Sequence, residues 1–204
     1  MPSNQTFPTW LLLNACNFTS PSGQTDSRTG AAIMAGGLTL GNSAALTEME
    51  ANQLSQTSVG TLHAGRYRMI QVDSSATAGN VKTGAIGYML SGGQPQINLA
   101  TDYSHGIVGA HPVVFLNSIT PGNYGFVQEM SGIGTVLCGA TLTVSGSAGM
   151  GGVLLSTTLG VVDCPTQSGS PTFVNLLNLV GVALDPPMPA TKIRCQLYGF
   201  SIQD

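Results

Sequence analysis

Only 15 of the chain's 204 residues carry a formal charge, which is 7% of the total and leaves a net charge of −3. Charged residues make up about 25% of a typical soluble domain. A compact monomer of this size would expose roughly 9,000 Å², or about one charge per 600 Å². Such a surface has little electrostatic protection against association, which favours a protein that works inside a tightly packed assembly.

Residues 1–42 predict an extended N-terminal arm, because Pro and Gly recur throughout and the first 25 residues carry no charge. Disordered tails are usually charged as well as polar. This segment instead holds a small apolar group, so we expect the arm to dock on its own domain or on a neighbouring subunit. The residues expected to make that capsid or subunit contact are Trp10, Leu11, Leu12, Leu13 and Phe18.

Residues 43–60 predict one short helix followed by a linker. Thr47 and Glu50 have the spacing of a capping box, in which each side chain satisfies a free amide of the first turn. Glu48 and Glu50 also lie where the helix dipole favours acids. We expect the helix over about 47–56.

From residue 61 to 204 the sequence predicts an all-β domain of the barrel or β-tulip type. Short β-branched or aromatic runs recur between clusters of Gly, Pro, Asn and Ser. Many short strands at such spacing are typical of a barrel or sandwich. The expected strands are 67–72, 85–90, 113–116, 124–128, 135–138, 141–144, 152–156, 179–184 and 193–197.

A weak internal echo relates residues 65–71 to residues 122–128, since both contain Gly, an aromatic two positions on and a final Gln. A second echo has a different offset, which excludes a solenoid with its fixed period. The echo indicates either two related β modules, 61–120 and 121–204, or coincidence.

Motifs for catalysis, metals and cofactors are weak. His63, His105 and His111 lack metal-ligand spacing, and Asp102, Ser104 and His105 are too close in sequence to converge as a triad. No basic stripe suits nucleic acid, and no apolar run reaches the roughly 18 residues of a membrane span. We therefore expect no enzyme, no cofactor, no metal, no direct nucleic-acid contact and no membrane contact.

Cys16, Cys138, Cys164 and Cys195 lie far apart and have no C-x-x-C spacing. This is not the pattern of a small secreted disulfide framework. Buried reduced thiols are the expected state, and one disulfide is the alternative.

The string Thr120-Pro121-Gly122-Asn123-Tyr124-Gly125-Phe126-Val127-Gln128, together with segments 65–74, 84–89 and 181–184, resembles the head decoration (capsid cement) proteins of tailed phages. The resemblance covers roughly residues 61–199. Within the string, Pro121 and Gly122 also fit the centre of a type II turn, where glycine supplies the positive φ.

The resemblance implies a β-barrel or β-tulip protein on the outer surface of the capsid. It would brace capsomers, and its partners would be the major capsid protein and further copies of itself, often as trimers. It would be made in the cytoplasm of the bacterial host and reside in the virion. Two alternatives stay open: another virion component (minor capsid, tail or fibre-associated), or a glycan-binding adhesin domain on the particle surface.

Overall fold

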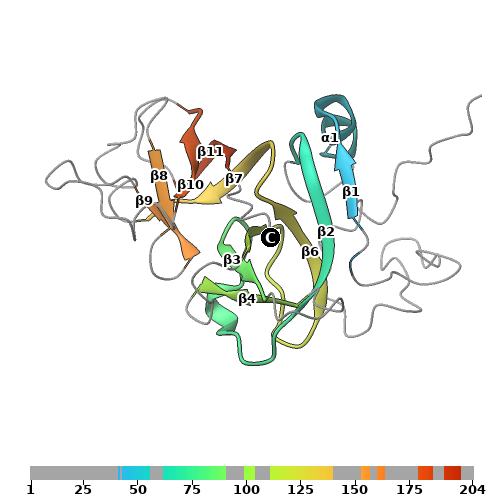
Figure 1. The fold of residues 1–204 in the computed structure, drawn as a ribbon, viewed down its shortest axis with the longest axis vertical. Coiled ribbons are helices and arrows are strands. Elements are labelled where there is room, and N and C mark those ends of the chain that lie inside the picture. The colour runs from blue at the N-terminus through green and yellow to red at the C-terminus, as the bar shows by residue number, and fades with distance from the viewer. Residues whose placement is uncertain are drawn as a thin grey trace, which may run out of the picture.

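The computed structural model describes residues 41, 43–55, 62–90, 99–103, 111–139, 153–156, 160–163, 179–185 and 191–198. Over these residues the chain is mostly β-strand with one short α-helix, so the expected all-β class is confirmed (Figure 1). The expected strand 141–144 lies outside the described residues, as does the arm over residues 1–40.

A closed barrel of five strands forms the centre of the fold. The first sheet has the order β1-β2-β4-β3-β5-β6, and β2 also pairs with β6, which closes the last five strands into a ring. Only the β2–β4 pair is parallel. The strands are β1 (Ser43–Leu46), β2 (Gly65–Val72), β3 (Ile86–Met89), β4 (Leu99–Asp102), β5 (His111–Phe115) and β6 (Tyr124–Glu129).

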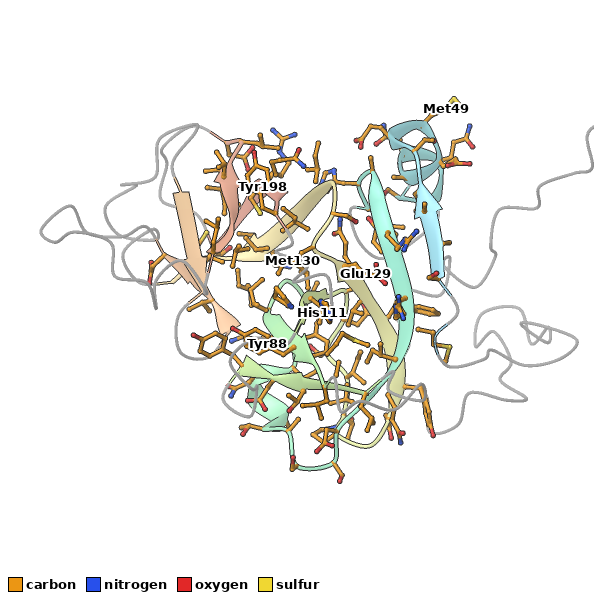
Figure 2. All side chains as sticks on the ribbon, in the orientation of Figure 1. Met49, Tyr88, His111, Glu129, Met130 and Tyr198 are labelled. Carbon is orange, nitrogen blue, oxygen red and sulfur yellow. The ribbon has the colours of Figure 1, made fainter. Side chains whose placement is uncertain are left out.

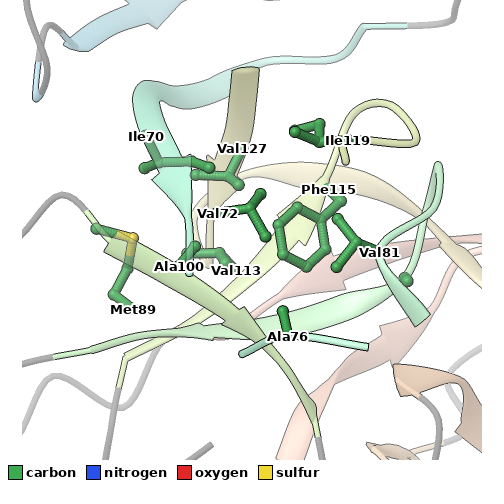
Figure 3. Packing of buried hydrophobic residues seen from close by; sticks show 11 residues of the cluster. Ile70, Val72, Ala76, Val81, Met89, Ala100, Val113, Phe115, Ile119 and Val127 are labelled. Atoms are coloured by element: carbon green, nitrogen blue, oxygen red, sulfur yellow. The ribbon is translucent and has the colours of Figure 1, made fainter. Parts of the chain in front are cut away.

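Strand alternation fills the barrel with aliphatic side chains around one aromatic ring. Phe115 is fully buried, and Val72 and Val81 lie close to its ring (Figure 3). A side chain at Gly87 would collide with the Phe115 ring and with the backbone carbonyl of Thr101. Glycine is therefore required at this point of β3, where another backbone and a ring approach closely.

The turn before β6 has the geometry expected from its sequence. Gly122 has a φ of 86°, and the Asn123 amide donates to the Thr120 carbonyl over 2.9 Å. A left-handed residue at the third position of a four-residue turn is the mark of type II. The turn feeds directly into β6, the strand that closes the barrel against β2.

A second sheet packs against the outside of the barrel. Its order is β7-β11-β10-β8-β9, and its strand pairs are antiparallel, with one isolated parallel bridge between Cys138 and Val162. One apolar cluster joins the two sheets, because Ile86, Val114 and Met130 of the barrel side contact Val180, Ile193 and Leu197 of the second sheet. The strands are β7 (Ile133–Leu137), β8 (Val153–Ser156), β9 (Val162–Asp163), β10 (Leu179–Ala183) and β11 (Lys192–Leu197).

The helix α1 (Glu48–Ser55) begins one residue after the predicted start and ends one residue before the predicted end. Its capping box is formed: the Thr47 amide donates to Glu50 Oε2 over 2.8 Å, and the Glu50 amide donates to Thr47 Oγ1 over 3.3 Å. The helix follows β1 directly, and both lie beside the start of β2 (Figure 1).

Candidate functional site

The expected contact residues Trp10, Leu11, Leu12, Leu13 and Phe18 lie outside the described residues. Their role therefore stays a prediction. Two features of the described surface bear on function. One is the way in which the few charged side chains are used. The other is the exposed surface formed by β1 and α1.

Glu48 connects α1 to residues 63–64, which lead into β2. Its Oε2 accepts a hydrogen bond from the Ala64 amide over 2.8 Å, and its Oε1 lies 3.8 Å from His63 Nδ1. The other ring nitrogen of His63 lies 3.2 Å from Thr135 Oγ1 on β7. The Tyr67 hydroxyl donates to the His63 carbonyl over 2.6 Å. His63 therefore links α1, β2 and the second sheet, which is a structural role.

Glu129 pairs with both arginines of β2, Arg66 and Arg68. Arg68 Nε donates to Glu129 Oε1 over 2.6 Å, and Arg66 Nε lies 3.9 Å from Glu129 Oε2. These side chains come from β2 and β6 at the position where the two strands pair. The ion pairs thus stabilise the β2–β6 pairing that closes the barrel.

Asp185 and Arg194 form a second internal ion pair, in which Arg194 donates to Asp185 from its backbone amide, from Nε and from Nη2, each over 2.7 Å. Burial tends to raise the pKa of Asp185, but the hydrogen bonds and the charge of Arg194 outweigh it and hold that pKa below the usual value. The pair links the end of β10 to β11.

Asp102 is fully buried and accepts hydrogen bonds from Asn80 Nδ2 over 2.7 Å and from the Thr77 amide over 3.2 Å. These hydrogen bonds connect the end of β4 to the short 3₁₀ helix at Ala78–Asn80. Ser104 and His105 lie outside the described residues. The contacts of Asp102 that are described here are structural.

Two of the four cysteines are described, and both carry free thiols. Burial, with nearby Asp163, raises the pKa of the Cys138 thiol to about 11, and burial raises that of Cys195 to about 12. Both pack in or against the cluster between barrel and second sheet. Within the described part of the chain, no three His, Cys, Asp or Glu side chains gather as a metal site.

These contacts leave few free charges on the outside. At least six of the seven described acidic side chains accept a hydrogen bond from within the chain, and Asp163 also has an interaction. Three of the five described cations pair with acids, and Lys82 and Lys192 are the described cations without an ion pair.

The β1–α1 surface is defined by the exposed residues of these two elements: Ser43, Ala45, Glu48, Met49, Asn52 and Gln53. Met49 is 70% exposed, the most exposed large apolar side chain of the described residues, and it points away from the body of the molecule (Figure 2). β1 pairs only with β2 among the described strands. Methionine is enriched at protein interfaces, so this surface is suited to contact another chain.

The sequence did not predict β1, because Ser43-Ala44-Ala45-Leu46 consists mainly of alanine and serine, which are not typical strand residues. Its pairing with β2 decides its structure, and a sequence pattern does not reveal pairing. The sequence indicates the exposure of Met49 only weakly. Met49 lies in the first turn of a short helix that has no wide apolar stripe.

Comparison of the chain with protein-family models, with curated proteins and with solved structures found no match. No helix within the described ranges is long and apolar enough to cross a membrane.

Proposed function

We propose that this chain is a decoration protein of a tailed-phage capsid, a structural and non-enzymatic part of the virion that binds the outer surface of the head. Its partners are the major capsid protein and further copies of itself. In this role it stabilises the capsomer lattice, and it acts without a cofactor.

The observation that carries the proposal is the small number of charged residues, 15 of 204, and the pairing of the described arginines with acids of the same chain. The described ion pairs join strands of the barrel or the ends of the second sheet, as in Arg68–Glu129 and Arg194–Asp185. The exterior is left poor in charge. A partner that covers such a surface has few ions to desolvate, and desolvation of ions is the main cost of polar interfaces. A neutral exterior therefore suits a protein that is covered by neighbours for its working life.

The construction of the fold also supports a bracing role. A closed barrel leaves no open edge within its ring, and the second sheet is attached to it through a shared apolar cluster. Load applied to one sheet is therefore transmitted to the other through packed side chains. The resemblance of residues 120–128 to decoration proteins is the reason for proposing the capsid as the surface that this protein braces.

Copy number in purified particles tests the proposal. The band of this chain, at 20.9 kDa, is quantified by gel densitometry against the major capsid protein of the same particles. We expect a ratio near one copy per capsid subunit. A few copies to dozens per particle would instead identify a tail or fibre component, and absence from washed particles would contradict a virion role.

A further inference from the structure

β1 is the exposed edge of the first sheet. It pairs with β2 in an unbroken antiparallel register, from Ser43 opposite Arg68 to Leu46 opposite Gly65. On its other side no described strand pairs with it. Ser43 and Ala45 are exposed, whereas Leu46 is buried against the domain. With respect to the described strands, β1 therefore leaves the backbone amides and carbonyls of its outer edge unpaired.

β1 is short, but its edge lacks the charges, prolines and bulges that usually protect edge strands. Natural edges carry charges, prolines or bulges that discourage pairing with another chain. β1 consists of Ser, Ala, Ala and Leu, and its register has no bulge. The side chains on its exposed face are small, so an added strand would meet no steric obstacle there. Met49, the second residue of α1, follows three residues after β1 and is 70% exposed.

We propose that the free edge of β1 takes an added strand from residues 10–18 of a second copy of this chain. The inference rests on the proposed function, because it assigns one of the self-contacts of that assembly. Strand addition uses main-chain hydrogen bonds for affinity and alternate side chains for specificity. Residues 10–18 are as free of charge as β1, and they include Trp10, Leu11, Leu12 and Leu13.

The length of chain between the donor segment and β1 permits this exchange. Residues 19–42, which are 24 residues, separate Phe18 from Ser43. Extended, they span up to about 80 Å, whereas a domain of this size has a radius of gyration of about 17 Å. As an added strand, residues 10–18 would place Cys16 on one face together with Trp10, Leu12, Asn14 and Phe18, and Leu11, Leu13 and Ala15 on the other. With its even-numbered face on the side of Ser43 and Ala45, the added strand would bring Cys16 beside those two positions.

Cys16 makes the proposal directly testable, because a cysteine placed on β1 can cross-link to it. In a Cys164→Ser background we introduce Ala45→Cys or Ser43→Cys and oxidise the purified protein at tens of micromolar. Both positions are exposed, so the substitutions should leave the melting temperature unchanged. We expect disulfide-linked dimers and larger species on a non-reducing gel with at least one of the two variants.

The matched controls are Ser74→Cys, an exposed position in the turn after β2, and Cys16→Ser combined with Ala45→Cys. Neither control should cross-link above background. Two chains are then co-expressed. The tagged chain keeps Cys16 and Ala45, and the untagged chain carries Cys16→Ser and Ala45→Cys. A disulfide between the two different chains is expected, since only exchange between copies can form it.

Three outcomes would overturn the inference: no cross-link at either β1 position, cross-linking equal to that of Ser74→Cys, or a disulfide formed only within one chain. As a second readout, Ala45→Lys adds a charge to the edge and should weaken self-association at least tenfold, whereas Ser74→Lys should not. These assays use purified protein without capsids, so their failure would leave the copy-number test of the proposed function unaffected.

Discussion

Truncation of Leu197 on β11 tests whether barrel and second sheet are one cooperative unit. Leu197 is 2% exposed and belongs to the cluster that contains Ile86 and Val114 of the barrel. Replacement of a buried leucine by alanine costs about 2–5 kcal/mol, and we expect about 3 kcal/mol for Leu197→Ala. For a chain of this length, that loss lowers the melting temperature by roughly 6–12 °C.

Hydrogen exchange followed by mass spectrometry measures the amide exchange rates of the two sheets separately in one experiment. A loss of about 3 kcal/mol increases the exchange rate of globally protected amides more than 100-fold. If the shared cluster couples the sheets, peptides from β2 and β6 should exchange faster by the same factor as peptides from β10 and β11. Lys192→Ala, at an exposed position of the same strand, is the control and should change stability by less than about 0.5 kcal/mol.

Faster exchange confined to β10 and β11, with β2 and β6 unchanged, would refute this reasoning. The barrel would then be stable alone, and the contact of Ile86 and Val114 with the second sheet would contribute little. A melting temperature that falls by less than about 2 °C would also contradict the magnitude assigned to Leu197.

Four further predictions follow from the proposed function and the fold. Capsids that lack this protein should assemble but release DNA at a lower temperature or sooner on chelation, and equal release from both particles would contradict a bracing role. Light scattering of the isolated protein at tens of micromolar should give a mass above 20.9 kDa, because so few charges oppose association; a clean monomer would count against this. Deletion of residues 1–42 should leave the β domain folded and weaken capsid occupancy at least tenfold, about 1.4 kcal/mol, and either unfolding or unchanged occupancy would contradict it. Cys138 and Cys195 should alkylate slowly at pH 8, since burial raises their pKa values to about 11 and about 12; rapid labelling of all four cysteines in the folded protein would show that burial does not protect these two.

The parts of the fold that sequence could predict are those fixed by local chemistry. The capping box of Thr47 and Glu50 fixes the start of α1, and Pro121-Gly122 fixes the turn before β6. Residues 67–72 and 124–128 are dense in aromatic and β-branched side chains, and both are strands, β2 and β6. In each case, neighbours within four residues decide the conformation.

The pairing of strands could not be predicted in this way. The two segments related by the internal echo, 65–71 and 122–128, lie side by side as β2 and β6, with Tyr67 opposite Gln128. That pairing closes the barrel and brings Arg68 to Glu129, 61 residues apart in sequence. Whether the echo reflects duplication stays a prediction. β4 was missed for the same reason as β1, since Leu99-Ala100-Thr101-Asp102 becomes a strand by pairing with β2 and β3.

The sparse charges and the neutral exterior have one physical explanation. An ion pair between two strands of one barrel, such as Arg68 with Glu129, forms at the high effective concentration set by the fold and specifies register. The same pair across a protein–protein interface would have to be desolvated in each partner before it formed. Hydroxyl and amide side chains such as Asn52 and Gln53 on the exposed side of α1 can both donate and accept, and they lose less on desolvation than ions do. A chain that must be covered repeatedly by copies of itself and by capsid subunits therefore benefits from few ions, paired within its own chain, and from neutral hydrogen-bonding groups on its contact surfaces.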